Sequence, residues 1–176
     1  MTSGLGLAAA ALVCAVAVAT SSATGVAATG APFCRGGALQ ITVVRSALVA
    51  AGNIGGYIGF TNRSRHVCRL SGWPTVVAIT AAGTSTTARH VRATMFGPYR
   101  VRGVPVVVLR PGKRADAVYA GSDIPGDGRT TCSPPYRRLR VTPPRSARAA
   151  LVAAPQPSCS GVIVTMVVRP SALYRG

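Results

Sequence analysis

Residues 104–119 read VPVVVLRPGKRADAVY, and this stretch indicates most clearly which kind of fold the chain adopts. Its first six residues are apolar and mostly β-branched, which is typical of a strand. The strand ends at 110–113, where proline followed by glycine favours a type II turn. Ala115, Ala117 and Tyr119 then return on one face. The stretch therefore predicts two strands joined as a hairpin.

Short apolar runs with the same character extend in both directions from this stretch. Leu39, Ile41 and Val43 alternate with polar residues, which is the period of two expected of a half-buried strand. Residues 146–154 could form one or two helical turns before Pro155 ends them. Further strands are predicted at 54–60, 76–80, 89–95, 139–141 and 162–168.

Eight or more short strands separated by turn residues are typical of a β-sandwich. We therefore predict an all-β fold, an immunoglobulin-like antiparallel β-sandwich with two disulfides. Residues 34–170 are expected to form this single domain, because the sequence shows neither an internal repeat nor a linker to a second domain.

The start of the chain has the character of an export signal. Leu5 to Ala19 is an unbroken apolar run, shorter than the roughly 20 residues that span a bilayer. Small residues follow it, as signal peptidase requires, although Met1 to Gly6 contains no Lys or Arg. We expect residues 1–30 to be a signal peptide and a disordered start, and the protein to be secreted or held at the cell envelope. Cys14 lacks the leucine and small residue that precede a lipidated cysteine, so no lipid anchor is expected there.

Four cysteines follow the leader, and an even number in a small exported domain indicates disulfides. Three pairings are possible, and we favour the two that close local loops. Each such loop of about 30 residues would contribute roughly 3.5 kcal/mol in the chain-entropy model. A zinc site needs ligands at short spacing, which these cysteines lack. The predicted pairs are Cys34–Cys68 and Cys132–Cys159.

The charge balance is strongly basic. Lys and Arg number 20 against 3 Asp and Glu, which gives a net charge of +17, and Lys113 is the only lysine. Such a surface attracts anions over long distances. Aromatic residues make up only 5% of the chain, so the stacking that nucleic-acid modules use is scarce. Expected partners are therefore an anionic envelope polymer, lipid head groups or an acidic protein. A GC-rich genome would also raise the arginine content without any partner, and this alternative stays open.

The arginines gather in two segments that are candidate anion-binding patches, because the guanidinium group pairs bidentately with phosphate and carboxylate. If Arg138 and Arg140 lie on the outward face of a strand, they form a basic stripe. The first patch comprises Arg137, Arg138, Arg140, Arg145 and Arg148. The second patch lies near the first predicted disulfide and comprises Arg35, Arg63, Arg65 and Arg69.

Catalytic chemistry finds few candidates in this sequence. No serine lies in a G-x-S-x-G elbow, and the chain has no Glu for a paired-carboxylate mechanism. We expect no enzyme activity, cofactor or metal. The function predicted is a non-catalytic envelope or extracellular binding domain. The alternative is a structural or protein–protein interaction domain that uses apolar loops and binds no polyanion.

Several motifs occur in an order that resembles a known family. They are Phe60–Ser64 (FTNRS), Val67–Pro74 (VCRLSGWP), Leu109–Gly112 (LRPG) and Leu139–Pro144 (LRVTPP), together with the four cysteines. This order resembles the actinobacterial exported family called domain of unknown function four-two-three-two, over roughly residues 34–170. The resemblance implies an exported β domain with two local disulfides and no assigned activity. Many members are lipoproteins, and this chain departs from them at Cys14.

Two residues of these motifs have expected structural roles. Trp73, directly before Pro74, is expected to anchor the core at a strand entry. Asn62 is expected to turn the chain by hydrogen bonding to nearby backbone.

Overall fold

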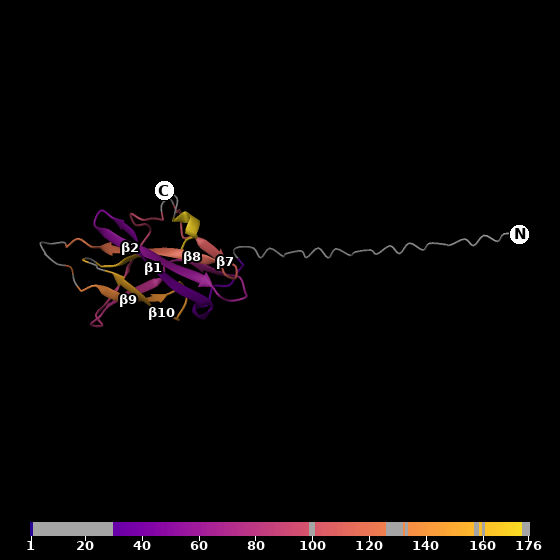
Figure 1. Cartoon of the computed structure of the whole chain (residues 1–176), viewed down its shortest axis with the longest axis horizontal. Helices are drawn as coiled ribbons and strands as arrows, with labels where there is room; N and C mark the ends of the chain where they lie inside the picture. Colours follow the sequence, from indigo (N-terminus) through magenta and orange to yellow (C-terminus); the bar gives the residue numbers. More distant parts are fainter. Residues whose placement is uncertain are drawn as a thin grey trace.

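Figure 1 shows the computed structural model of the chain. The expected leader, with its apolar run Leu5–Ala19 and Cys14, lies outside the described residues and stays a prediction. The structure describes residues 1, 30–98, 101–125, 132, 134–156, 159 and 161–173.

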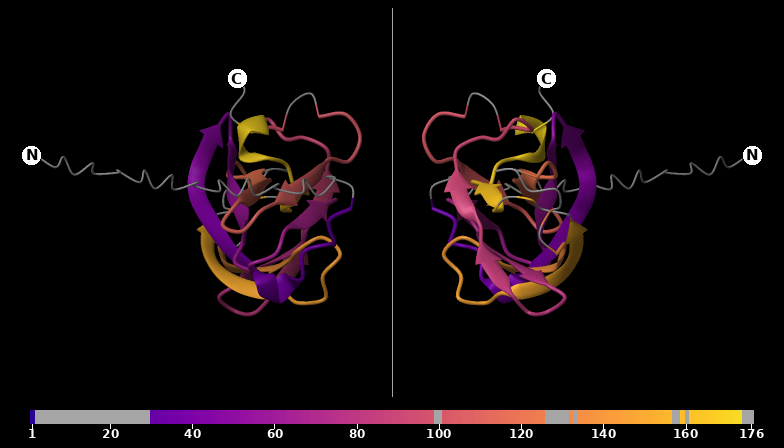
Figure 2. Two further views of the ribbon diagram at one scale, coloured as in Figure 1. Left: turned by 90° about the vertical axis from the view of Figure 1, so that its right-hand side faces the viewer. Right: turned by 90° about the vertical axis from the view of Figure 1, so that its left-hand side faces the viewer.

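The described residues form three sheets that pack as a β-sandwich, which confirms the predicted all-β fold (Figures 1 and 2). The five-stranded sheet has the order β1-β2-β8-β11-β6, with β1 at Leu39–Ala50, β2 at Asn53–Asn62, β8 at Arg114–Ser122, β11 at Ile163–Thr165 and β6 at Arg89–Val91. The four-stranded sheet has the order β10-β9-β4-β5, with β10 at Ala150–Gln156, β9 at Tyr136–Thr142, β4 at Thr75–Thr80 and β5 at Ser85–Thr87. A two-stranded sheet joins β3 at Cys68–Ser71 to β7 at Val106–Leu109, and short 3-10 helices lie at Gly36–Ala38 and Pro170–Ala172.

The two main sheets are connected along both of their sides. On one side, β1 and β10 run close together without pairing (Figure 2). On the other side, β5 continues through Ala88 into β6. The Ala88 amide donates to the carbonyl of Val76 in one sheet, and the Arg89 amide donates to that of Val162 beside the other. Within the described strands, the β6–β11 pair is parallel and the other pairs are antiparallel.

The turn predicted at 110–113 is present, but the prediction that it joins two paired strands as a hairpin is wrong. The Lys113 amide donates to the Arg110 carbonyl at 3.0 Å, and Gly112 has a φ of 74°, as a type II turn requires. β7 pairs with β3, however, whereas β8 pairs with β2 and β11. The turn also bonds to Asn62, which directs β8 along β2 instead of back along β7. It therefore joins two sheets.

The helical turns predicted at 146–154 are also wrong, because this segment contributes to β10. Ala150 to Ala153 pair with β9 in an antiparallel register. Val152 packs against the main core and Ala154 is buried, whereas Leu151 is 52% exposed. Sheet pairing overrides the helix preference of the alanines here. The short strands β3 and β5 were not predicted either.

The buried apolar side chains form two clusters. The main core lies between the sheets and contains Ile58, Phe60 and Tyr119. The second cluster contains Tyr57 and Val118, which alternate with those residues along β2 and β8. Because successive side chains of a strand point to opposite faces, both strands are buried on both sides.

The sequence had suggested that Trp73 anchors the main core, but it does not. It is half-buried and packs against the second cluster. Its indole N–H donates to the Val91 carbonyl at 2.8 Å, and its ring stacks on that of His90 at 5.9 Å between centroids. Trp73 therefore ties the β3–β4 connection to β6, which explains its large size without placing it between the sheets.

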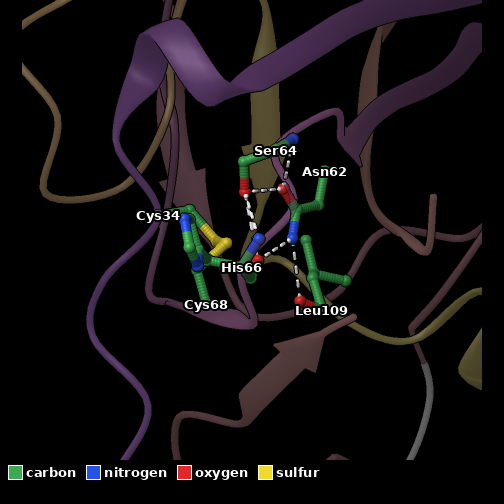
Figure 3. Close-up of a disulfide and its surroundings, with 6 residues drawn as sticks. All are labelled: Cys34, Asn62, Ser64, His66, Cys68 and Leu109. Atoms are coloured by element: carbon green, nitrogen blue, oxygen red, sulfur yellow. Dashed lines mark hydrogen bonds between the residues drawn. A yellow bond between two sulfur atoms is a disulfide. The ribbon is translucent and has the colours of Figure 1, made fainter. Parts of the chain in front are cut away.

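Both predicted disulfides are present, Cys34–Cys68 and Cys132–Cys159. The first is buried and joins Cα atoms that are 4.9 Å apart (Figure 3). The Cys34 amide also donates to the Arg69 carbonyl at 2.9 Å, and the Arg69 amide donates to the Pro32 carbonyl at 2.8 Å. The segment before β1 is thus fixed to β3 by covalent and hydrogen bonds together.

The side chain of Asn62 connects the end of β2 to the loop that follows it and to the end of β7 (Figure 3). Its side-chain N–H groups donate to the carbonyls of His66 at 2.8 Å and Leu109 at 3.0 Å. Its Oδ1 accepts from the Ser64 amide at 2.9 Å and the Ser64 hydroxyl at 2.8 Å. The predicted bond to nearby backbone is confirmed. The long-range bond to β7 was not foreseen.

Asp116 is a buried carboxylic acid near the start of β8. Its Oδ1 accepts from Arg114 Nε, and among the described residues its Oδ2 has no hydrogen-bond partner. Burial raises the pKa of Asp116, while the hydrogen bond and charge of Arg114 act in the opposite direction. A Cβ at Gly59 would lie 2.7 Å from Arg114 Nε, so glycine leaves the space that this arginine occupies.

We predict that Asn62→Asp lowers the free energy of unfolding by at least about 2 kcal/mol, because an ionised carboxylate cannot donate to the carbonyls of His66 and Leu109. The matched control is Asn53→Asp at the other end of β2, where one exposed bond of 3.1 Å reaches the Ala51 carbonyl. This control is expected to cost less than about 1 kcal/mol. Denaturant unfolding of the oxidised protein measures both, and equal losses would contradict the role of Asn62.

A second prediction concerns pH. The folded protein holds the Asp116 proton more tightly than the unfolded chain, whose pKa is near 3.8. Stability should therefore fall as pH rises from that value through the raised pKa of the folded state, and then level off. Asp116→Asn is expected to remove this decline, and Arg114→Gln to extend it to higher pH. Unfolding curves recorded across the acidic range test this, and a decline of equal size in Asp116→Asn would exclude Asp116 as its source.

Candidate functional site

The outer face of the four-stranded sheet carries two of the predicted arginines. Along β9, Leu139 and Val141 are buried in the main core, whereas Arg138 and Arg140 are exposed. The condition for a basic stripe, that these two arginines lie on the outward face of a strand, is met. Residues two apart on a strand are separated by roughly 7 Å, so the two cations stand in a short row.

The strand register shows which residues surround this row. Arg140 lies between Leu151 of β10 and Val77 of β4. Arg138 lies between Ala153 and Ile79 on the same strands. Within the part of the chain that the structure describes, neither guanidinium has a hydrogen-bond or ion-pair partner. We call this surface the arginine sheet face; it comprises Arg138, Arg140, Val77, Ile79, Leu151 and Ala153.

Two further arginines of the first patch, Arg145 and Arg148, do not lie on the arginine sheet face but near the second patch. The Arg145 guanidinium carbon lies 4.6 Å from the centroid of the Phe33 ring, and that of Arg69 lies 4.4 Å from the same centroid. Arg148 packs beside Gly37, where a Cβ would meet its Nη1 at 3.0 Å. The predicted patches are therefore regrouped. We call this second site the Phe33 cluster; it comprises Phe33, Arg69, Arg145 and Arg148.

The remaining predicted arginines do not join either site by direct contact. Arg63 donates through Nε to the Gln40 side-chain oxygen at 2.7 Å. Arg35, Arg65 and Arg137 are exposed. Phe33 itself was missed by the sequence analysis. Its position directly before a disulfide cysteine was the available signal, and that signal does not say which cations would reach the ring.

The described residues contain no group of three or more His, Cys, Asp or Glu side chains that could hold a metal ion. His90 stacks on Trp73, and its Nε2 lies 3.2 Å from the Pro74 carbonyl oxygen. Within the same residues, no helix has the length and apolar character needed to cross a membrane.

Comparison with known proteins gives one family. No curated protein and no solved structure matched the chain. A family model described as Domain of unknown function (DUF4232) matches residues 34–170, from the first disulfide cysteine to the last 3-10 helix. This match covers most of the chain and includes the arginines of both sites, so the chain belongs to the DUF4232 family.

Proposed function

We propose that this protein is an exported, non-catalytic domain that binds polyanions at the cell envelope or outside the cell. The observation that carries the proposal is the arginine sheet face, where Arg138 and Arg140 stand exposed in the middle of a sheet. The whole chain has 3 Asp and Glu residues for 20 Lys and Arg. Its own carboxylates cannot neutralise this surface, so anions from outside must do so.

The geometry of the sheet favours a ligand with repeated negative charges. A strand in the interior of a sheet holds its side-chain origins rigidly, so the spacing of the two cations is set before binding. Arginine donates two parallel hydrogen bonds to phosphate or carboxylate, which adds direction to the attraction between charges. An anionic envelope polymer, a lipid head group or an acidic protein segment could supply such charges.

Two features support export. Disulfides persist in oxidising compartments and are rare in the cytosol, and this small domain has two of them. The apolar run Leu5–Ala19 precedes the domain and has the length of a signal-peptide core. Both features belong to the same proposal, because a domain that folds outside the cytosol meets envelope polymers and lipid surfaces there.

The alternative is a structural or protein–protein interaction domain that binds no polyanion. The observation in its favour is a set of exposed apolar side chains around the β6–β7 connection, namely Met95, Val104 and Val106, each 44–45% exposed. A partner held by these residues would be recognised by apolar contact. Salt separates the two functions, since screening weakens attraction between charges and leaves apolar contact intact.

We predict that the full-length oxidised protein binds inorganic polyphosphate and that its affinity falls steeply as salt rises. The double variant Arg138→Gln/Arg140→Gln should bind at least roughly tenfold more weakly, because hydrogen bonds to charged groups contribute about 1.5–3 kcal/mol each. Titrations at two or more salt concentrations measure both effects.

The matched control is Arg65→Gln/Arg110→Gln, which removes the same charge from exposed positions away from the sheet face. It preserves the row of arginines and should lose much less affinity. Equal losses in both double variants would mean that net charge alone acts. Binding that ignores salt, or no binding, would reject the proposed function in favour of the apolar alternative.

A further inference from the structure

The Phe33 cluster places two positive charges against one aromatic ring. The guanidinium carbons of Arg69 and Arg145 lie 4.4 Å and 4.6 Å from the ring centroid. Their separation is therefore at most 9.0 Å, the sum of those two distances. The ring attracts both cations through its π electrons, but the cations repel each other. An anion between or beside them would attract both cations and offset their mutual repulsion.

One half of the cluster is fixed by the first disulfide. Phe33 directly precedes Cys34, and Arg69 directly follows Cys68, so the disulfide joins the neighbours of both residues. Phe33 and Arg69 also form a parallel bridge, supported by the hydrogen bond from the Cys34 amide to the Arg69 carbonyl. The backbone of Phe33 and that of Arg69 are thus held together before any ligand arrives.

The other half comes from the loop after β9. Pro143 and Pro144 are buried, and the Ser146 amide donates to the Pro143 carbonyl at 3.1 Å, which closes a turn. Arg145 lies inside this turn with a φ of +56°. This conformation is unfavourable for a side chain with a Cβ and is common only for glycine and asparagine. The loop nevertheless presents an arginine here, and its guanidinium reaches the ring.

A third cation, Arg148, follows Arg145 by three residues in the same loop. Arg148 packs along Gly37, and its amide donates to the Ser146 hydroxyl at 3.1 Å. A Cβ at Gly36 would clash with the Ser146 hydroxyl, so the small residues before β1 allow the loop to approach. Arg69 from β3 and Arg145 from the loop after β9 therefore reach the same ring, and Arg148 of that loop packs against the segment that follows Cys34.

We infer that the Phe33 cluster is a discrete binding site for a phosphate group. The inference rests on the proposed function for the charge of the ligand, and it adds a defined site away from the arginine sheet face. A planar carboxylate matches one guanidinium fork, whereas the oxygens of a tetrahedral phosphate point in several directions and can accept from arginines on separate segments. The phosphate can be a free ion or part of a lipid head group.

The test uses inorganic phosphate and the full-length oxidised protein, followed by isothermal titration and by amide NMR shifts at residues 33 and 145. Saturable binding is expected. Arg145→Asn should weaken it roughly tenfold through loss of charge-assisted hydrogen bonds. Asparagine tolerates a positive φ, so this variant keeps the turn and removes only the cation.

A second variant and a control separate geometry from charge. Phe33→Leu keeps every arginine but removes the ring that positions two of them, and it should also weaken phosphate binding. The control Arg110→Gln, at an exposed position outside both arginine sites, changes the net charge as much as Arg145→Asn does and should leave phosphate affinity unchanged. Sedimentation with phosphatidylglycerol vesicles then shows whether Arg145→Asn also weakens binding to a lipid phosphate, which identifies the source of the group.

Two results would overturn the inference. One is the absence of saturable phosphate binding, and the other is an equal loss of affinity in Arg145→Asn and Arg110→Gln. If polyphosphate still bound in a salt-dependent manner under either result, the proposed function would stand and only the phosphate site would fall. If salt-dependent polyphosphate binding were also absent, the proposed function would fail independently.

Discussion

The side-chain amide of Asn62 is the interaction on which the arrangement of the sheets depends. It uses both N–H groups and its oxygen inside a fully buried site, where an unmade hydrogen bond is costly. Its bonds hold the end of β2, the loop that leads to Cys68, and the end of β7 in one place. The Asn62 backbone bonds the turn between β7 and β8 as well. A single residue therefore positions the five-stranded sheet, through β2, and the two-stranded sheet, through β7.

Local patterns predicted the elements of the fold well, because the period of two along β1 and β9 reflects one face turned to the core and one turned outward. They failed where the partner of a strand lies far away in the sequence. The turn at 110–113 was recognised, but its proline and glycine cannot indicate that Asn62 would bind it and send β8 along β2. In β10, only Leu151 and Val152 show the alternation of exposed and core-facing side chains, because most of their neighbours are alanines. A helix was therefore expected there instead.

In the candidate sites, too, local patterns predicted some features, and contacts between distant segments could not be predicted. Arg138 and Arg140 were placed correctly because their direction follows from neighbours within one strand. The Phe33 cluster could not be predicted, since it depends on how the loop at 143–148 packs against the segment before β1. Grouping arginines by their distance along the sequence put Arg145 and Arg148 with the wrong partners. Trp73 was misplaced for a related reason: its size indicates burial, but not which of two apolar clusters it joins.

The continuous passage from β5 through Ala88 to β6 has a consequence for how the molecule behaves among its own copies. Strands with free backbone groups at the edge of a sheet tend to recruit other chains and start aggregation. Here one segment supplies both edges on that side, and each edge strand is only three residues long. On the opposite side, the edge strands β1 and β10 lie against each other, so each covers the edge of the other's sheet. The two main sheets thus offer little template for intermolecular pairing.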